Sequence, residues 1–193
     1  GERYLFVKVH TDEGLVGLGE CGAWGYQEAT AAVLKQMEKL LQGQDPMRIE
    51  FIWNALTRNL HFRGSITQAA VSGIDIALWD LKAKFFGVPC YELLGGKTRE
   101  KIKIYVNVRA KNAAEFAENA KKIKNQGFKA IRFSIGHPKN EDGRCGENFS
   151  AIVSRVENIM KSIREAVGWD MDIAIECHRG LRPAEAIELG RAR

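Results

Sequence analysis

The stretch MDIAIECHRGL, residues 171–181, ends an apolar run with two ionisable side chains. Its apolar residues alternate with small or polar ones, which is typical of a half-buried strand. Glu176 and His178 share one face of that strand, and Cys177 lies on the other. The pattern places an acid and a base where the strand leaves the core. A salt-bridged glutamate and a structural histidine are the alternative interpretation.

Similar strand segments precede this one, and helical segments separate them. Strands are expected at 101–108 (KIKIYVNV), 129–136 (KAIRFSIG) and 172–178 (DIAIECH), and helices at 113–127, at 148–168 and from 182 onward. The first two helices end on a glycine, and the last begins behind Pro183. Strands that alternate with helices in this way predict parallel βα units.

Each of these strands has one apolar face and one mixed or polar face. The apolar faces carry Ile102, Ile104, Val106 and Val108, then Ile131, Phe133 and Ile135, then Ile173, Ile175 and Cys177; the other faces carry Lys103, Tyr105, Asn107 and Arg109, then Ala130, Arg132 and Ser134, then Asp172, Ala174, Glu176 and His178. An open doubly wound sheet would need apolar residues on both faces. A single helix-covered face instead predicts a TIM-type barrel, of which residues 96–193 would form the first three βα units.

Residues 1–95 have a different organisation, which predicts an α+β domain with a hairpin and helices. The run RYLFVKVHTDEGLVGLGE reads as two strands around a turn at Asp12–Gly14. Helices are expected at 28–41 and 66–86, and another should begin with Asp45 as its N-cap and Pro46 at its first position. The predicted fold is therefore an α+β capping domain followed by an α/β domain, which is part of a TIM-type barrel.

The composition limits the possible classes of protein. The chain is 45% hydrophobic over 193 residues, which is enough for a packed core. Its net charge of +5 is dispersed, so nucleic-acid binding is not favoured. The four cysteines form no CxxC pair, which argues against a zinc ribbon or redox pair. Without a long apolar run or a signal-like start we expect no membrane partner and a cytoplasmic protein, or one that has lost a leader.

Two segments carry a family resemblance. AAVSGIDIALWDLKAKFFGVPCYELLGG, residues 69–96, resembles the helix and following segment that join cap to barrel in the mandelate racemase and muconate lactonizing enzyme group of the enolase superfamily. The hairpin FVKVHTDEGLVGLGE resembles that group's capping-domain hairpin. The resemblance implies abstraction of a proton alpha to a carboxylate, with the enediolate stabilised by a magnesium ion (Mg2+) on three acidic residues. It also implies a homo-oligomer, because members are often oligomers.

The same resemblance assigns roles at the strand ends. It maps a metal ligand onto Glu176, where the family more often has aspartate. Arg132 and Ser134 stand where racemase-like and lactonizing members carry a Lys-x-Lys base, so we expect them to bind substrate. The ECH motif and the loop at 136–148 are similar to galactonate and mannonate dehydratase-like members, in which the histidine is an acid/base; His178 is then the catalytic acid.

Two loops of the cap match family loops that close over the barrel mouth. These loops are ECGAWGYQ and LHFRGS, and Trp24, Tyr26, His61 and Arg63 in them could touch a substrate. Packing on the rim of the barrel is the alternative for each of these residues.

The function implied for a complete protein is a magnesium-dependent dehydratase of sugar acids. It would remove an alpha proton next to a carboxylate and eliminate water from the enediolate. A racemase, epimerase or cycloisomerase of the same group is one alternative, and a non-catalytic sugar-acid-binding or interaction fragment is another. Because a complete barrel has eight strands, we expect a fragment with three to be inactive alone.

Overall fold

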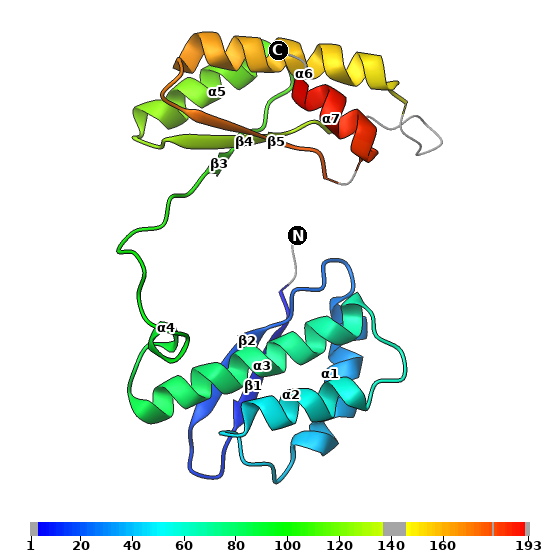
Figure 1. Cartoon of the computed structure of the whole chain (residues 1–193), viewed down its shortest axis with the longest axis vertical. Helices are drawn as coiled ribbons and strands as arrows, with labels where there is room; N and C mark the ends of the chain where they lie inside the picture. Colours follow the sequence, from blue (N-terminus) through cyan, green and yellow to red (C-terminus); the bar gives the residue numbers. More distant parts are fainter. Residues whose placement is uncertain (1–3, 137–145, 179, 192–193) are drawn as a thin grey trace. The chain divides into compact units, whose positions relative to one another are not determined.

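The computed structural model describes residues 4–136, 146–178 and 180–191. The chain divides into two units, Gly1–Glu100 and Lys101–Arg193 (Figure 1). Most of the loop expected at 136–148 and Arg179 of the HRG segment lie outside the described residues.

The first unit begins with an antiparallel hairpin, as predicted. β1 (Phe6–His10) pairs with β2 (Val16–Glu20). Thr11 closes the turn, because its hydroxyl accepts from the Leu15 N–H at 3.0 Å. Gly14 takes a φ of +84°, a left-handed conformation that glycine adopts without steric cost.

Four helices follow the hairpin: α1 (Gln27–Leu41), α2 (Ile49–Arg58), α3 (Ser65–Phe86) and the short α4 (Cys90–Leu93). The predicted start of α2 is wrong, since Arg48 and not Asp45 is its N-cap residue. Asp45 instead accepts a hydrogen bond from the Met47 N–H at 2.9 Å, which forms an Asx turn ahead of the helix. The short aspartate side chain satisfies a nearby N–H equally well in such a turn.

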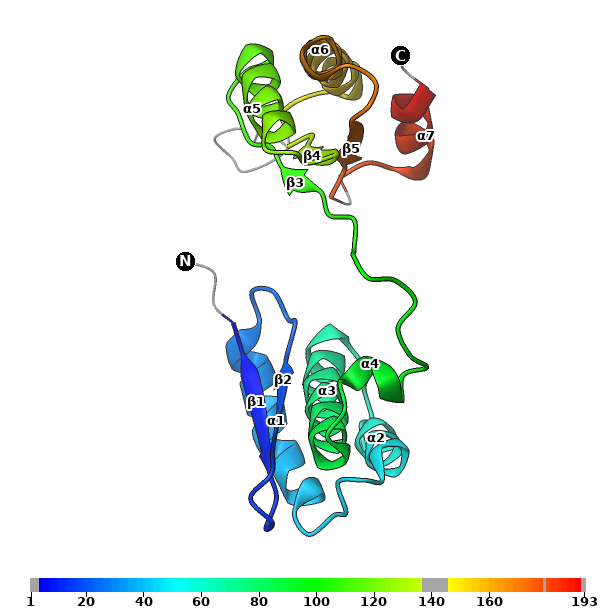
Figure 2. The ribbon, with the colours of Figure 1, turned by 90° about the vertical axis from the view of Figure 1, so that its left-hand side faces the viewer.

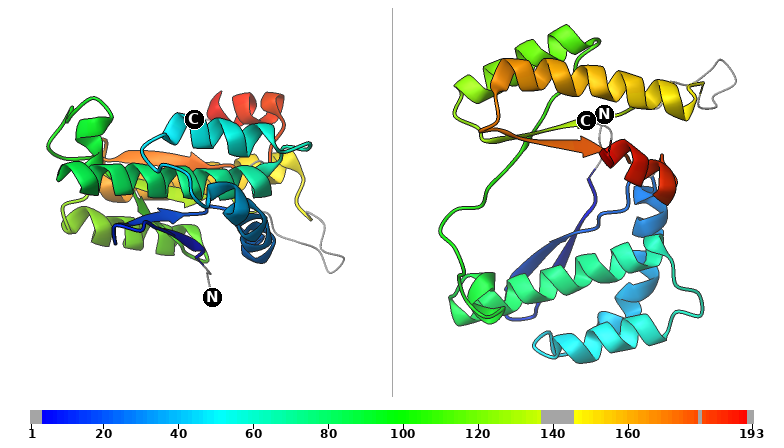
Figure 3. Two further views of the ribbon diagram at one scale, coloured as in Figure 1. Left: turned by 90° about the horizontal axis from the view of Figure 1, so that it is seen from below. Right: turned by 45° about the horizontal axis from the view of Figure 1, so that its top comes forward.

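α3 is the central helix of this unit, and Figure 3 shows the hairpin lying along it. Its buried face carries Ile74, Ala77, Leu78 and Leu81, which are each at most 2% exposed. β2 approaches α3 unusually closely at its glycines. A Cβ on Gly19 would lie 1.9 Å from the Gly73 carbonyl oxygen. Only glycine therefore permits this approach of strand and helix.

The second unit contains a parallel sheet whose strand order is β3-β4-β5. Its elements are β3 (Val106–Asn107), α5 (Ala113–Asn125), β4 (Ala130–Ser134), α6 (Phe149–Val167), β5 (Asp172–Glu176) and α7 (Pro183–Arg191). Figure 2 shows α5 and α6 over one face of the sheet. The three predicted βα units are confirmed. Asn112 and Asn148 cap α5 and α6 by accepting N–H groups at 2.9 Å each.

The apolar face of β4 is buried under these helices, as the alternation predicted. Ile131, Phe133 and Ile135 are at most 1% exposed. Ile173, Ile175 and Cys177 pack against the same core with partial burial.

The first predicted strand is much shorter than expected. Only Val106–Asn107 is a strand, and Ile102 and Ile104 are 76% and 58% exposed. Val106 pairs with Ile131 near the start of β4, so residues ahead of Val106 have almost no strand beside them. The prediction of a buried apolar face for residues 102–104 is therefore wrong. Val108, at the other end, is buried as expected.

Among the helices of the described ranges, none has the length and apolar character required to cross a bilayer.

Candidate functional site

Polar side chains meet at the carboxyl-terminal ends of the parallel strands. The Arg132 Nη1 donates to Glu176 Oε2 at 2.7 Å. The Arg132 Nε donates to Asn107 Oδ1 at 2.8 Å. The guanidinium carbon lies 5.1 Å from the centre of the Tyr105 ring. Three strands thus contribute to one network on the face away from the helices.

Strand register explains this convergence. Asn107 and Arg132 are direct Cα partners between β3 and β4, and Ser134 and Glu176 are partners between β4 and β5. Residues that are two apart on a strand point to the same face. The long arginine side chain can therefore reach diagonally from its own level to Glu176, two residues beyond its direct partner Ala174.

Glu176 is the centre of the network, because both of its carboxylate oxygens accept hydrogen bonds. Oε2 takes the arginine contact, and Oε1 accepts the His178 backbone N–H at 2.8 Å. Its side chain is 29% exposed and that of Arg132 is 30% exposed. The pair is thus partly desolvated, which strengthens it relative to a surface ion pair.

The chain turns sharply directly after Glu176. His178 has a φ of +42°, and no other non-glycine residue of the described ranges has a positive φ. Gly180 N–H donates to the Cys177 carbonyl oxygen at 2.8 Å, which closes the turn. The His178 side chain is exposed, and its ring has no hydrogen bond to any residue that the structure describes. The imidazole is therefore accessible at the strand end.

Ser134 occupies the same edge but is engaged with the backbone. Its hydroxyl donates to the Glu176 carbonyl oxygen at 3.5 Å and accepts from the Gly136 N–H at 3.2 Å. These contacts stabilise the end of β4 beside the end of β5. A substrate contact by Ser134 stays a prediction.

Cys177 lies between the two ionisable residues but belongs to the core. Its side chain packs against the buried cluster on the helix side of the sheet. Burial raises the pKa of the Cys177 thiol, and the neighbouring Glu176 charge raises it further. A raised pKa disfavours the thiolate, which is the form of cysteine that acts as a nucleophile.

The donor set for a metal ion is incomplete in the part of the chain that the structure describes. No group of three or more histidine, cysteine, aspartate or glutamate side chains is placed to hold one. Glu176 is the carboxylate of the network, and hard cations such as magnesium prefer such oxygens. A carboxylate has about four lone-pair positions, of which Arg132 and the His178 N–H use two. Glu176 therefore fits as one ligand, and the described residues do not complete a set of three around it.

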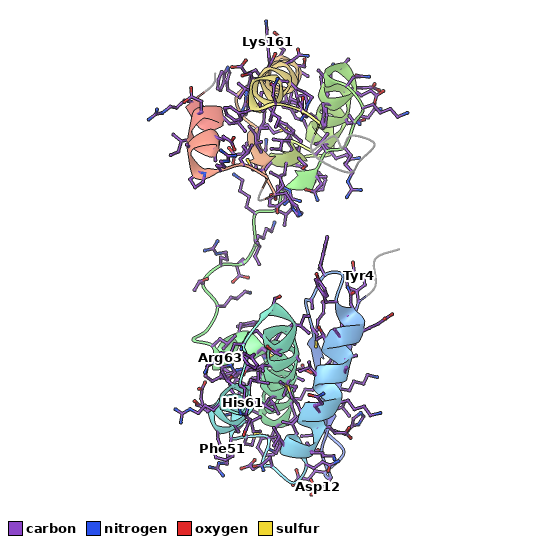
Figure 4. All side chains as sticks on the ribbon, turned by 90° about the vertical axis from the view of Figure 1, so that its right-hand side faces the viewer. Tyr4, Asp12, Phe51, His61, Arg63 and Lys161 are labelled. Carbon is purple, nitrogen blue, oxygen red and sulfur yellow. The ribbon has the colours of Figure 1, made fainter. Side chains whose placement is uncertain are left out.

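The cap residues singled out in the sequence lie in the first unit. Trp24 and Tyr26, which precede α1, are 79% and 59% exposed. His61 and Arg63 lie on the loop between α2 and α3 and are exposed (Figure 4). Accessible side chains of this kind are available to contact a substrate, and that role stays a prediction.

Asn107 and Tyr105 received no role from the sequence. Alternation places both on the polar face of the first strand, with Arg132 on the matching face of the second. That shared face is the signal that could have indicated them. The register that sets Asn107 opposite Arg132 was needed to pair the two.

Comparison with known proteins agrees with this architecture. Residues 1–95 match the family described as mandelate racemase / muconate lactonizing enzyme, N-terminal domain. Residues 115–193 match the family described as enolase C-terminal domain-like.

Named relatives and a solved structure give the same result. A D-galactonate dehydratase family member, RspA, from Halomonas elongata is 31% identical and aligns with 99% of this chain and 53% of its own length. A D-mannonate dehydratase from a Sphingomonas species is 32% identical and aligns with 99% of this chain and 53% of its own. The structure of an enolase from Agrobacterium radiobacter with bound sodium and L-malate is 33% identical, with a TM-score of 0.84 over 98% of this chain and 48% of that chain.

The chain spans about half the length of these relatives. The predicted fold class is confirmed, since a capping domain and the first part of an α/β barrel are what the matched proteins share with it. The chain belongs to the mandelate racemase and muconate lactonizing enzyme group of the enolase superfamily.

Proposed function

We propose that the complete protein containing this chain dehydrates sugar acids with the help of a magnesium ion. The observation that carries this proposal is the acid-x-His strand end, with Glu176 held at 2.7 Å by Arg132 and the His178 ring exposed beside it. Relatives named galactonate and mannonate dehydratases support a sugar acid as substrate. The sodium and L-malate in the Agrobacterium enolase support a small carboxylate and a cation in such a site.

Glu176 would be one of the metal ligands. A bound magnesium ion supplies charge that stabilises a substrate carboxylate as its alpha proton is removed. Glu176 would hold this ion through its carboxylate, which has lone pairs beyond those that Arg132 and the His178 N–H use. Arg132 and the His178 N–H would fix the orientation of the carboxylate, which is the usual task of hydrogen bonds around a metal ligand.

His178 would deliver the proton that the departing hydroxyl needs. Imidazole exchanges protons near neutral pH more readily than any other side chain. His178 is exposed directly after β5, and its backbone N–H is bonded to Glu176 Oε1. The base that removes the alpha proton would come from another part of the complete protein.

Arg132 would hold a substrate oxygen rather than accept a proton. Its guanidinium stays charged at working pH, so it cannot replace the Lys-x-Lys base of racemase-like members. This supports a dehydratase over a racemase or cycloisomerase.

The cap residues Trp24, Tyr26 and Arg63 would contribute further substrate contacts. We also infer that the complete protein is cytoplasmic. The family resemblance suggests in addition that it is a homo-oligomer. Gel filtration with light scattering would test the oligomeric state.

The proposal is tested by supplying sugar acids to a form of this protein extended to the length of its relatives. With magnesium present, the substrate should lose its alpha proton and its beta hydroxyl as water. The product should be a 2-oxo acid, which reacts with semicarbazide. Galactonate and mannonate are the first substrates to try, with gluconate and galactarate beside them. Inversion of the alpha carbon without loss of water would instead identify a racemase or epimerase. Binding of sugar acids without any turnover would identify the non-catalytic alternative.

A further inference from the structure

We propose that Asn107 and Tyr105 are positioning residues that hold Arg132 in a fixed orientation, with one guanidinium nitrogen left for a substrate oxygen. The orientation itself follows from the contacts in this chain. The identity of the oxygen rests on the proposed dehydratase function.

Arg132 is restrained in three directions. Its Nε donates to Asn107 Oδ1 at 2.8 Å, and its Nη1 donates to Glu176 Oε2 at 2.7 Å. The Tyr105 ring lies under the guanidinium, 5.1 Å from its central carbon. Two in-plane contacts and one contact from the ring face define the plane of the guanidinium and its rotation within that plane.

The guanidinium is planar and has five N–H donors in a rigid fork. Two of its nitrogens are used by Asn107 and Glu176. The third, Nη2, has no hydrogen-bond partner among residues 4–136, 146–178 and 180–191. Because the fork is rigid, fixing the first two nitrogens also fixes the direction of the N–H groups on Nη2.

A simple ion pair between Arg132 and Glu176 would not need this arrangement. A long arginine side chain can satisfy one carboxylate in many rotamers. The Asn107 contact restricts the rotamers of Arg132, because Nε must reach Asn107 while Nη1 reaches Glu176. Binding a substrate oxygen to a group that is already ordered costs less conformational entropy than ordering the arginine at that moment.

The first experiment observes the Arg132 side chain directly by NMR, in the 193-residue chain. The Nε proton of Arg132 should give its own signal in an arginine-selective 15N–1H spectrum, assigned with Arg132→Lys. Asn107→Leu should speed its exchange with solvent by roughly five- to tenfold, the effect of losing one net hydrogen bond. Asn107→Asp keeps an acceptor and should preserve the slow exchange. Asn125→Leu makes the same change at an exposed site at the end of α5 and should leave the signal unaltered.

The ring contact has its own pair of variants. Tyr105→Phe keeps an aromatic face and should preserve slow exchange, whereas Tyr105→Leu should speed it. Equal exchange rates in wild type, Asn107→Leu and Tyr105→Leu would overturn the positioning role.

The second experiment measures kinetics in the extended form. Asn107→Leu should raise KM by about tenfold with a smaller change in kcat, because it disorders a substrate ligand without removing the acid. In an Arg132→Gln background the same substitution should have almost no further effect. An Asn107→Leu effect of equal size in both backgrounds would contradict action through Arg132.

The two experiments separate two kinds of failure. If the extended protein dehydrates no sugar acid, the proposed function is wrong, and proton exchange still reports whether Asn107 and Tyr105 order Arg132. If dehydration occurs and Asn107→Leu changes neither KM nor proton exchange, the function stands and the positioning role is wrong.

Discussion

At the scale of single residues, a few atoms around Glu176 determine what the site can do. Its two oxygens accept from Arg132 and from the His178 backbone, so the side chain is held in one orientation at the end of β5. The adjacent Cys177 packs against the core, whereas Glu176 bonds to Arg132 on the other face of the sheet. The proposed roles therefore rest on Glu176 and His178, and each of these residues can be replaced separately.

Replacing Glu176 with glutamine tests the metal ligand. Glu176→Gln keeps the size of the side chain but removes its charge. Loss of a residue that hydrogen-bonds a metal ligand typically lowers metal affinity by roughly 10–100-fold. Glu176 would be a ligand itself, so in the extended form we expect Glu176→Gln to lower magnesium affinity by more than this. Isothermal titration calorimetry with magnesium chloride measures this. Glu185→Gln is the control, since Glu185 lies in α7 and its carboxylate accepts from the Arg182 N–H at 2.7 Å. Equal affinities in wild type and Glu176→Gln would remove Glu176 from the metal site.

Replacing His178 with asparagine tests the acid. Asparagine tolerates the positive φ of +42° at this position better than most residues, so the turn should persist. His178→Asn should lower the dehydration rate by roughly 10²–10⁴, the usual contribution of a positioned acid. Magnesium affinity and exchange of the alpha proton with deuterium should survive, because the base lies elsewhere. Loss of alpha-proton exchange as well would make His178 the base.

At the scale of elements, the first unit depends on how closely β2 approaches α3. Gly17 and Gly19 face the Ala77 and Gly73 carbonyl groups, where any side chain would collide. The same edge of β2 is also bonded to α3, because Asp80 accepts from the Leu18 N–H at 2.8 Å. Small residues and one aspartate thus fix the hairpin on the helix.

A methyl group at position 19 should loosen this contact. In Gly19→Ala the Cβ would lie 1.9 Å from the Gly73 carbonyl oxygen, so strand or helix must move. We expect a loss of about 1–3 kcal/mol in the free energy of unfolding, the usual cost of overpacking. Gly22→Ala, which would place its Cβ in open space, should change stability by less than about 0.5 kcal/mol.

Urea unfolding followed by tryptophan fluorescence measures this difference. A Trp169→Phe background leaves Trp24, Trp53 and Trp79, all in the first unit, as reporters. Similar midpoints for the two alanine variants would show that the close approach is not required.

Asp80 makes the contact between β2 and α3 dependent on pH. Burial tends to raise its pKa, but the Lys84 ammonium at 2.7 Å and the Leu18 N–H together outweigh burial and lower it. A lowered pKa in the folded state adds stability above the unfolded pKa of about 3.9, and this stability is lost as pH falls through the folded value.

Asp80→Asn should therefore reduce the free energy of unfolding by about 0.5–1 kcal/mol at pH 7, in line with a partly exposed ion pair. The difference from wild type should shrink below about pH 4. Asp12→Asn, at the hairpin turn, is the control for the loss of one charge. A difference between wild type and Asp80→Asn that stays constant down to pH 2 would contradict the ionic origin.

At the scale of the whole molecule, charge and hydrophobicity are divided between two units that each have a core of their own. The lysine run of α5 is part of the net charge of +5, and two of its side chains have partners. Lys122 pairs with Glu118 at 2.7 Å, and Lys124 donates to the Val167 carbonyl oxygen at 2.5 Å. Two lysines of this run are therefore engaged in contacts within the second unit.

The sequence by itself determined most of the elements, and it determined which face of β4 is buried. The alternation of β4 predicted the burial of Ile131, Phe133 and Ile135, and the glycines after helices predicted where several of them end. These features are local, because periodicity and backbone freedom act within a few residues. The candidate pair Glu176 and His178 also came from local alternation, together with a family resemblance.

Only the tertiary structure decided which polar groups meet. Arg132 and Glu176 are far apart in the chain, and the register of β4 and β5 brings them to 2.7 Å. The same register paired Asn107 with Arg132. Residues 102–104 alternate as a strand should, but β4 offers no partner there, so Ile102 and Ile104 stay exposed. A strand needs a neighbour to satisfy its backbone, and a sequence pattern does not specify where that neighbour begins.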